Sequence, residues 1–363
     1  MSTLRRVASE ADVSIATASR VLNSSGVVSD NARHRVLEAA SKLRYSGLRR
    51  SVGNYLALAY TGQSSVTSPY DVAILGGMFK AADEDKFDLA VIRLQHDRKS
   101  GESFSQLLQR KCVRAVVLRT NAETRSICRE LAQEGFPSIV VGDCFKDEPV
   151  NYLYCDSRPT SCQAIEHLIS LGHRRIAIAV SHIPDNDHND RLAGYERALK
   201  NHQIEVDPRL VYRVVPKRPN GAQVIRHLMS IPDRPTAIFI ADPLVAVGAI
   251  NQAHEMGVRI PQDVSIVGFD DTDSRNNVFP TMSAVCQDTR QLGYEAGRSL
   301  AQILADESSG PVQKTLPTWL ELHQTTGCAP ADPLRVLPDG SRVPAWTSPA
   351  AGGGSDERVP AST

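Results

Sequence analysis

TLRRVASEADVSIATASRVLN, residues 3–23, is the stretch that decides how the chain begins to fold. Thr3 can cap a short helix, because apolar residues follow it at the spacing of one helical face: Leu4, Val7, Ala8 and Ala11. Ser14 can cap a second helix over residues 15–23, whose apolar face is formed by Ala18, Val21 and Leu22. Two short helices joined by a tight turn predict a helix-turn-helix.

A third helix, expected over residues 30–43 with Ser29 as its cap, closes a small three-helix core. About 50 residues with so few large apolar side chains bury little surface, so we expect the function of the module to lie in its exposed side chains. In a helix-turn-helix, the second helix enters the major groove, where its side chains meet base edges and phosphates. The candidate DNA contacts of this module are Thr3, Leu4, Ser14, Ile15, Ala16, Thr17, Ser19, Arg20 and Asn23. A helical hairpin that merely packs does not explain hydroxyls and an Arg on the face away from the core.

Charge is distributed unevenly along the chain. Residues 1–55 carry nine Lys or Arg against four Asp or Glu, a net charge of +5. The whole chain has 41 of each, which leaves −5 for the remainder. A small basic module is therefore joined to a larger, mildly acidic one, as expected of a DNA-binding domain with a partner domain. A merely solvated basic surface explains the charge equally well.

Length and composition bound the remaining possibilities. The 363 residues suffice for two or three domains with a sizeable core. No apolar run approaches the roughly 20 residues that span a bilayer, and residues 1–10 lack an apolar signal segment, so we expect a cytoplasmic protein without a membrane partner. The seven Cys are odd in number and never spaced as C-x-x-C, which argues against a disulfide framework and a zinc site.

From residue 55 the pattern changes to short apolar runs alternating with helical stretches. Strands are expected at residues 55–60, 87–93, 115–118, 138–141, 175–180, 237–240 and 265–269, and helices at 70–85, 124–134, 159–171, 191–201, 244–256 and 289–306. This alternation predicts an α/β body of two doubly wound parallel sheets, with ligands bound at the carboxyl ends of the strands in a cleft between the halves. In residues 331–363, Pro, Gly, Ala and Ser make up 18 of 33, which predicts a disordered tail.

The amino-terminal pattern TLxxVAxxAxVSxxTxSRVLN, followed by Val28-Ser29, Arg33, Val36 and Tyr45, resembles the headpiece of the LacI (lac/galactose repressor) family of transcription regulators. The resemblance implies a headpiece over residues 1–46 that binds double-stranded operator DNA as part of a dimer. It further implies a body over residues 55–330 that is similar to periplasmic binding proteins and senses a small molecule.

Two departures from the family pattern concern the headpiece. Asp12 stands where the family usually has Gly, at a position expected to need a positive φ, which Asp tolerates better than most residues. The segment SGLRRSVGN at 46–54 is shorter than the family's hinge helix, so residues 47–54 form a shortened linker. Leu48 and Val52 are the candidates for a wedge residue in the minor groove, Leu48 being the one counted among the DNA contacts. We expect weaker coupling between effector and operator than in relatives with a full hinge.

The resemblance extends to about Pro330 through the motifs AIxHLxxLGHRRI at 164–176, RxxGY at 191–195 and PxDVSIVGFDD at 261–271. By position, Arg191 and Asp270 match the family's effector-binding Arg and Asp. Further candidates are Ser68, Tyr70, Asp143 and Asp242, the last in an Ala-Asp-Pro sequence where the family commonly has Asn-Asp. An Arg fork and carboxylates suit the hydroxyls of a small polar effector. The alternative is a salt bridge from Arg191 to Asp270 or Asp190 that only holds the lobes together.

The sequence thus predicts a homodimeric DNA-binding regulator, in particular a repressor, whose operator affinity is controlled by a sugar-like effector. A two-lobed solute receptor and a cleft enzyme are the alternatives, but the first predicts a signal peptide and the second a nucleophile or an acid/base pair. We therefore expect no catalytic residue and no cofactor. The loop at 181–190 is crowded with His and Asp, yet it lacks helical metal-ligand spacing, and no metal site is expected.

Overall fold

A computed structural model describes residues 3–22, 28–43, 45, 54–62, 68–183, 185–306, 310–337 and 340–346. By its internal contacts the chain divides into two compact units. Unit 1 comprises Met1–Asp156, Ile183–Asn189 and Gln287–Thr318, and unit 2 comprises Ser157–His182, Asp190–Cys286 and Trp319–Thr363.

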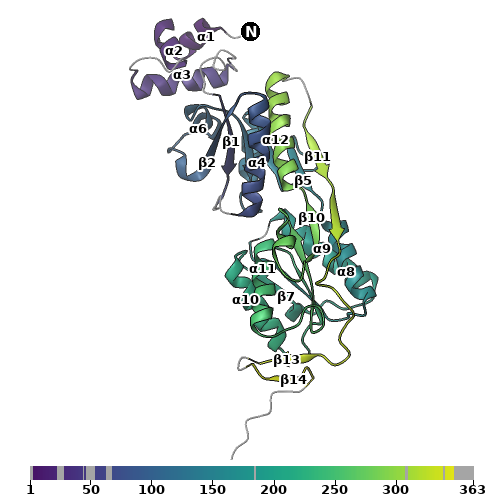
Figure 1. The fold of residues 1–363 in the computed structure, drawn as a ribbon. Helices are drawn as coiled ribbons and strands as arrows, with labels where there is room; N and C mark the ends of the chain where they lie inside the picture. Colours follow the sequence, from purple (N-terminus) through teal and green to yellow (C-terminus); the bar gives the residue numbers. More distant parts are fainter. Residues whose placement is uncertain are drawn as a thin grey trace, which may run out of the picture. The chain divides into compact units, whose positions relative to one another are not determined.

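The headpiece is a three-helix module within unit 1, as the sequence predicts (Figure 1). It consists of α1 (Leu4–Glu10), α2 (Ile15–Leu22) and α3 (Asp30–Lys42) around a core formed by Val7, Ala8, Ala11, Ala18, Val21, Leu22, Val36, Ala39 and Ala40. Asp12 in the turn has a φ of 50°, which confirms the expected left-handed position. The prediction that Thr3 caps α1 through its side chain is wrong. Instead, the backbone carbonyl of Thr3 accepts from the N–H groups of Arg6 and Val7.

The rest of unit 1 is a parallel sheet in the order β11-β5-β4-β3-β1-β2, covered on both faces. The strands are β1 (Tyr55–Tyr60), β2 (Asp88–Arg93), β3 (Val113–Arg119), β4 (Ser138–Val141), β5 (Tyr152–Cys155) and β11 (Gln313–Leu316). One face packs against α4 (Pro69–Glu84) and α12 (Thr289–Ala305), the other against α6 (Phe104–Arg110) and α7 (Arg125–Gln133). The short helix α5 (Leu94–Asp97) follows β2.

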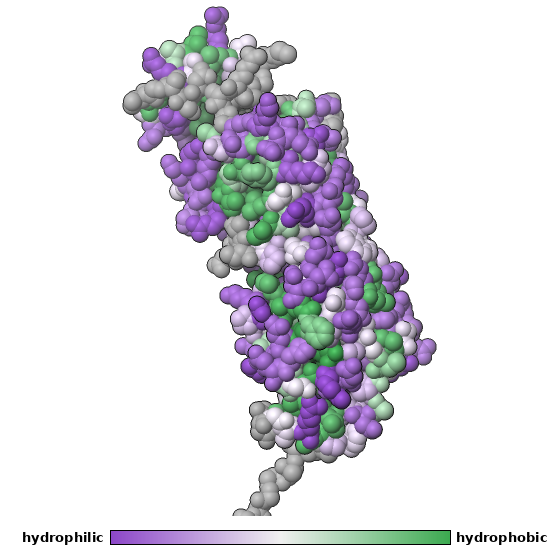
Figure 2. Space-filling view, in the orientation of Figure 1, coloured by the Kyte–Doolittle hydropathy of each residue, from purple (hydrophilic) through white to green (hydrophobic). Residues whose placement is uncertain are grey.

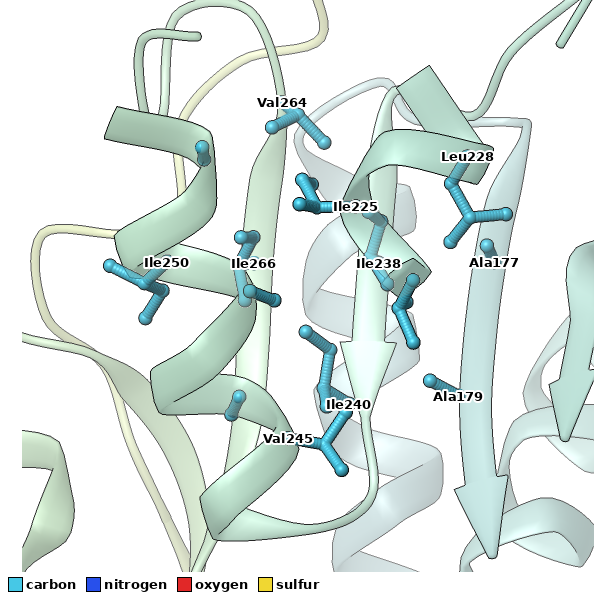
Figure 3. Close-up of a cluster of buried hydrophobic side chains, with 14 of the residues drawn as sticks. Ala177, Ala179, Ile225, Leu228, Ile238, Ile240, Val245, Ile250, Val264 and Ile266 are labelled. Atoms are coloured by element: carbon cyan, nitrogen blue, oxygen red, sulfur yellow. The ribbon is translucent and has the colours of Figure 1, made fainter. Parts of the chain in front are cut away.

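Unit 2 repeats this plan with the strand order β12-β10-β9-β8-β6-β7. The strands are β6 (Ile176–Ser181), β7 (Val211–Val214), β8 (Ala237–Ile240), β9 (Ser265–Asp270), β10 (Ser283–Gln287) and β12 (Thr318–Glu321). Helices α8 (Arg158–Ser170) and α9 (Asn186–Asn201) cover one face, and α10 (Arg218–Ser230) and α11 (Pro243–Glu255) cover the other (Figure 3). Short 3-10 helices lie at Pro208–Leu210 and Ser274–Asn277. The fold class predicted from the sequence is confirmed.

In both units, neighbouring helices approach closely at glycines. Gly221 of α10 and Gly248 of α11 face the partner helix so tightly that a Cβ on Gly248 would lie 1.9 Å from the carbonyl oxygen of Arg218. In unit 1, a Cβ on Gly77 of α4 would lie 2.0 Å from the carbonyl oxygen of Arg290 on α12. Because only glycine leaves room for this backbone contact, these positions fix how the helices lie on their sheets.

The prediction that the chain is disordered from residue 331 is wrong for the described part of that segment. Strands β13 (Leu334–Val336) and β14 (Arg342–Pro344) pair as an antiparallel hairpin. The buried Arg234 holds this hairpin, because its guanidinium donates to the carbonyl oxygens of Leu334, Pro235 and Asp263. Composition alone did not reveal that a few apolar side chains, such as Val336, reach the core of unit 2.

A buried histidine ties together the strands of unit 2. His173 has no exposed surface, and its Nε2 lies 3.0 Å from the carbonyl oxygen of Gly327, which can only accept. Nε2 therefore carries the proton, and Nδ1 accepts from the Thr236 hydroxyl at 2.8 Å. Burial lowers the pKa of His173, since the charged ring is poorly solvated there.

This histidine makes a testable contribution to pH dependence. As the pH falls below about 6.5, the unfolded chain takes up a proton on His173 before the folded chain does. We therefore expect unit 2 to lose stability between pH 7.5 and 5, and a His173→Gln variant to lose less over this range. Urea unfolding at the two pH values measures the difference, with the exposed His202→Gln as the control. An identical pH dependence in His173→Gln and the parent protein would contradict the assignment.

Candidate DNA-binding surface and effector-binding residues

The second helix of the headpiece has a buried face and an exposed face. Ala18, Val21 and Leu22 are buried in the headpiece core, which fixes the rotation of α2. Ile15 is 45% exposed, and Ala16 and Arg20 are also exposed. An exposed Ile at the start of this helix is suited to contact a thymine methyl, and an exposed Arg is suited to a phosphate or a base edge.

Local contacts hold the start of α2 and the turn before it. The Ser14 hydroxyl accepts from the Thr17 N–H at 3.0 Å, which confirms the predicted cap, and also lies 2.8 Å from the Thr17 hydroxyl. An ion pair of 2.6 Å between Glu10 and Lys42 links the first and third helices.

Among the other predicted contacts, Thr3 is exposed, Ser19 is half-buried and Leu4 packs partly against the core. Asn23, Leu48 and Val52 lie outside the described residues.

In unit 1, the polar candidates gather where β1 and β3 end, the point at which the strand order changes direction. Ser68 caps α4 by accepting from the Asp71 N–H, and its hydroxyl donates to the Asp71 carboxylate at 2.7 Å. The Tyr70 ring lies 4.4 Å from the guanidinium of Arg119, the last residue of β3. Arg119 also donates to Asp71 at 3.1 Å. This edge therefore presents an aromatic face and a charged pair side by side.

Asp143, just beyond β4, is the third predicted residue of this edge. Its carboxylate accepts from Arg125 at 2.6 Å and from the Cys144 N–H at 2.7 Å. Burial raises the pKa of Asp143 to about 6, although the Arg125 guanidinium and the backbone N–H act in the opposite direction. The carboxylate is thus costly to keep ionised, and a ligand that donates hydrogen bonds would favour its charged form.

The sequence analysis missed Asp71, Arg119 and Arg125. The available signal was position, because Arg119 ends a buried strand and Arg125 begins the helix after the next turn. Charged residues at the carboxyl ends of parallel strands are expected to face a ligand site. Their pairing with Asp71 and Asp143 joins residues 18 to 48 positions apart and could not be read from spacing.

In unit 2, Arg191 of α9 is 3% exposed and lies against the end of the sheet. Its Nη1 donates to the carbonyl oxygen of Ala241 at 2.6 Å, and its guanidinium carbon lies 3.4 Å from the centre of the Phe269 ring. The Nε–H is buried without a hydrogen-bond partner among the described residues. A buried, unsatisfied donor on a cation is costly, so this group is suited to receive an acceptor from a ligand.

The salt-bridge alternative for Arg191 is not what the structure describes. The ion pair of Asp190 is with Arg158, and that of Asp270 is with Arg275 at 2.8 Å. Asp270 is fully buried as a side chain and also accepts from the N–H groups of Thr272, Ser274 and Arg275. In this structure its oxygens organise the loop after β9, so the prediction that Asp270 touches an effector remains untested.

Two further residues complete the carboxyl edge of unit 2. Asp242 caps α11, because one carboxylate oxygen accepts from the Val245 N–H at 2.9 Å, and its other oxygen has no described partner. Glu321 receives hydrogen bonds from Arg275 and from the indole of Trp319. The Trp319 indole and Arg275 hold the pKa of Glu321 near 2, so this carboxylate stays ionised. Within the described residues, no group of three or more His, Cys, Asp or Glu is placed to hold a metal ion.

Two family models match the chain in sequence. Residues 3–47 match the model described as bacterial regulatory proteins, lacI family, and residues 165–326 match a periplasmic binding protein-like domain. In the part of the chain that the structure describes, no helix is long and apolar enough to cross a membrane.

Named relatives and solved structures agree with these matches. The ribose operon repressor of Haemophilus influenzae is 29% identical over 308 residues, covering 83% of this chain and 92% of the relative. The transcriptional regulator DegA of Bacillus subtilis is 26% identical over 336 residues, covering 89% and 98%. A complex of the transcriptional regulator CelR with cellobiose has a TM-score of 0.66 at 28% identity, covering 90% of this chain and all of that one.

The lac repressor dimer, solved with operator and an anti-inducer, has a TM-score of 0.63 at 25% identity and covers 90% of this chain and 99% of its own. This likeness spans the headpiece and the body together, as do the alignments to the named relatives. The exposed face of α2 and the two doubly wound units are the parts that such regulators require. The chain therefore carries a headpiece that matches the lacI family of bacterial regulatory proteins together with a periplasmic-binding-protein-like domain, and it is a DNA-binding transcriptional regulator.

Proposed function

We propose that the chain is a homodimeric repressor that binds operator DNA through α2 and releases or tightens its hold when a sugar or sugar derivative binds the body. The exposed Ile15, Ala16 and Arg20, displayed on a helix whose opposite face is buried, carry the DNA-binding part of the proposal. A protein that works on operator DNA acts in the cytoplasm. The relatives are transcriptional regulators, and we propose no catalytic activity.

DNA recognition can be tested with Thr17→Ala and Arg20→Ala. We expect Thr17→Ala to reduce the preference for cognate over scrambled duplex, and Arg20→Ala to weaken binding, each by about 10- to 100-fold, the effect of about 1–3 kcal/mol. Gel shift at physiological salt, with DNA from the chain's own upstream region, measures both. The exposed Lys146→Ala in unit 1 removes one cation away from the headpiece and is the matched control. If the parent protein and both variants showed the same affinity and the same preference for cognate over scrambled duplex, α2 would not be the DNA-binding helix.

A sugar-like effector is supported by relatives and by chemistry. The names of two similar proteins mention ribose and cellobiose. The carboxyl edge of unit 1 offers an aromatic face, Tyr70, beside Arg119 and Asp143, and that of unit 2 offers the unsatisfied Arg191. Guanidinium groups and carboxylates satisfy sugar hydroxyls, and an aromatic ring covers the apolar face of a sugar ring. A thermal-shift screen of sugars and nucleobases would identify the effector.

Dimer formation is supported by apolar residues on the outer face of α4. Val72 and Phe79 lie two helical turns apart and are 56% and 64% exposed, and Figure 2 shows hydrophobic surface gathered over this helix. We expect Phe79→Asp to convert the dimer into monomer, because dimerisation would bury the introduced charge. Sedimentation velocity measures the change, and Val91→Asp, at an exposed position of β2, is the control. A Phe79→Asp protein that remains dimeric at micromolar concentration would exclude this surface.

A further inference from the structure

A cavity lies within unit 2, on the face of the sheet covered by α10 and α11. Its volume is about 670 Å³, within the range of small-molecule sites. Three walls line it. Gln223, Arg226, His227 and Ser230 come from α10, Gln252, Glu255 and Met256 come from the end of α11, and Val336, Leu337 and Gly340 come from the carboxyl-terminal hairpin. None of these residues belongs to the proposed DNA or effector contacts.

Helix packing explains why a cavity forms here. Gly221 and Gly248 bring the amino-terminal halves of α10 and α11 into backbone contact. The lining residues from the two helices lie after these glycines in the sequence, toward the carboxyl-terminal end of each helix. The hairpin then forms the third wall, held by Arg234 and by an Arg342 bond to the carbonyl oxygen of Gly257. The hairpin lies beyond residue 326, where the match to the periplasmic binding protein-like model ends.

Opposite charges stand on the two helical walls. Arg226 uses one nitrogen, Nη2, to donate to Gln252 at 2.5 Å, and its remaining N–H groups have no partner among the described residues. Glu255 is exposed, and the structure describes no ion pair for its carboxylate. Met256, Val336 and Leu337 add apolar surface to the lining. The cavity is thus close to neutral as a whole, with one cationic wall, one anionic wall and an apolar wall.

We propose that this cavity is a second small-molecule site, which binds a zwitterion with an apolar body, such as an amino acid or a dipeptide. Arg226 pairs with the carboxylate of the ligand, Glu255 pairs with its ammonium group, and the apolar part lies against Met256 and Leu337. A ligand with only one of the two charges would desolvate the opposite wall without replacing its hydrogen bonds, which is unfavourable. Because the hairpin forms one wall, binding is expected to protect the backbone of residues 334–337 from hydrogen exchange.

The test uses calorimetric titration of the full-length protein with L-leucine and L-leucyl-L-leucine. N-acetyl-L-leucine and L-leucinamide serve as the single-charge probes. We expect saturable binding of at least one zwitterion, and at least tenfold weaker binding of both single-charge forms. Hydrogen exchange should show increased protection of residues 334–337 in the presence of the zwitterion that binds. Absence of saturable binding for both zwitterions, or equal affinity for charged and blocked forms, would overturn the proposal.

Variants locate the binding at the two charged walls. Arg226→Gln and Glu255→Gln should each weaken the zwitterion at least tenfold, and the exchange of both residues, Arg226→Glu with Glu255→Arg, should recover part of the loss. Glu205→Gln removes an exposed carboxylate elsewhere in unit 2 and is the matched control. Arg191→Ala should leave zwitterion binding unchanged, which separates this site from the effector. Sedimentation confirms that each variant keeps the parent's oligomeric state. Unchanged affinity in both Gln variants would overturn the assignment.

Discussion

Replacing Arg191 with Ala is expected to abolish the thermal stabilisation that the effector gives, while operator binding without effector stays intact. A ligand at 100 times its dissociation constant stabilises the folded protein by about 2.7 kcal/mol, which is readily measured as a shift in melting temperature. The shift should disappear because the guanidinium, stacked on Phe269 and fixed by Ala241, carries a buried Nε–H that lacks an acceptor among the described residues.

Two companion variants make the result specific. Arg191→Lys keeps the charge but loses the fork, so we expect most of the effector stabilisation to be lost as well. Arg197→Ala removes an exposed cation from the same helix, α9, and should leave the shift unchanged. Melting curves without ligand establish that each variant is folded before the comparison is made. An undiminished shift in Arg191→Ala would remove this residue from the effector site.

The headpiece could be predicted closely because its signals are local. Helix spacing, the Ser14 cap and the positive φ at Asp12 all depend on residues within one or two turns of each other. The same holds for the chain order of strands and helices in the body, where buried runs alternate with helical ones.

The side-chain partners in the body could not be predicted, since they are set by strand order rather than by sequence distance. Asp270 reads as a free ligand carboxylate, but the loop after β9 folds back and satisfies it with Arg275 and three backbone N–H groups. The role of Arg119 could not be predicted from the sequence because its partner Asp71 is 48 residues away. The pairing of β13 with β14 could not be predicted, because the segment has a polar, Gly-rich and Pro-rich composition. The buried Arg234 holds it by donating to a backbone carbonyl of β13.

Gly248→Ala is expected to destabilise unit 2 strongly, with a loss of about 3 kcal/mol in the free energy of unfolding. The added methyl group would lie 1.9 Å from the carbonyl oxygen of Arg218 and 3.3 Å from the Cα of Gly221. Since these are backbone atoms, no side chain can rotate away, and α10 and α11 must move apart. That movement would disturb the core beneath them, which includes Ile225 and Ile250 (Figure 3).

Calorimetric unfolding of the full chain measures the effect, with Gly76→Ala as the matched control. Gly76 is also within a helix, α4, but within one chain a Cβ there meets nothing closer than the Arg290 side chain at 3.9 Å. Both glycine variants are made in the Phe79→Asp background, because Gly76 lies on the same exposed face of α4 as the residues proposed for the dimer surface. Alanine has the higher helix propensity, so the control should be neutral or more stable by up to about 1 kcal/mol. The two variants make the same chemical change and should move stability in opposite directions. If Gly248→Ala were as stable as Gly76→Ala, the close approach of α10 and α11 could not be the contact that fixes this face of unit 2. The cavity at the carboxyl-terminal ends of the same helices would then need another explanation.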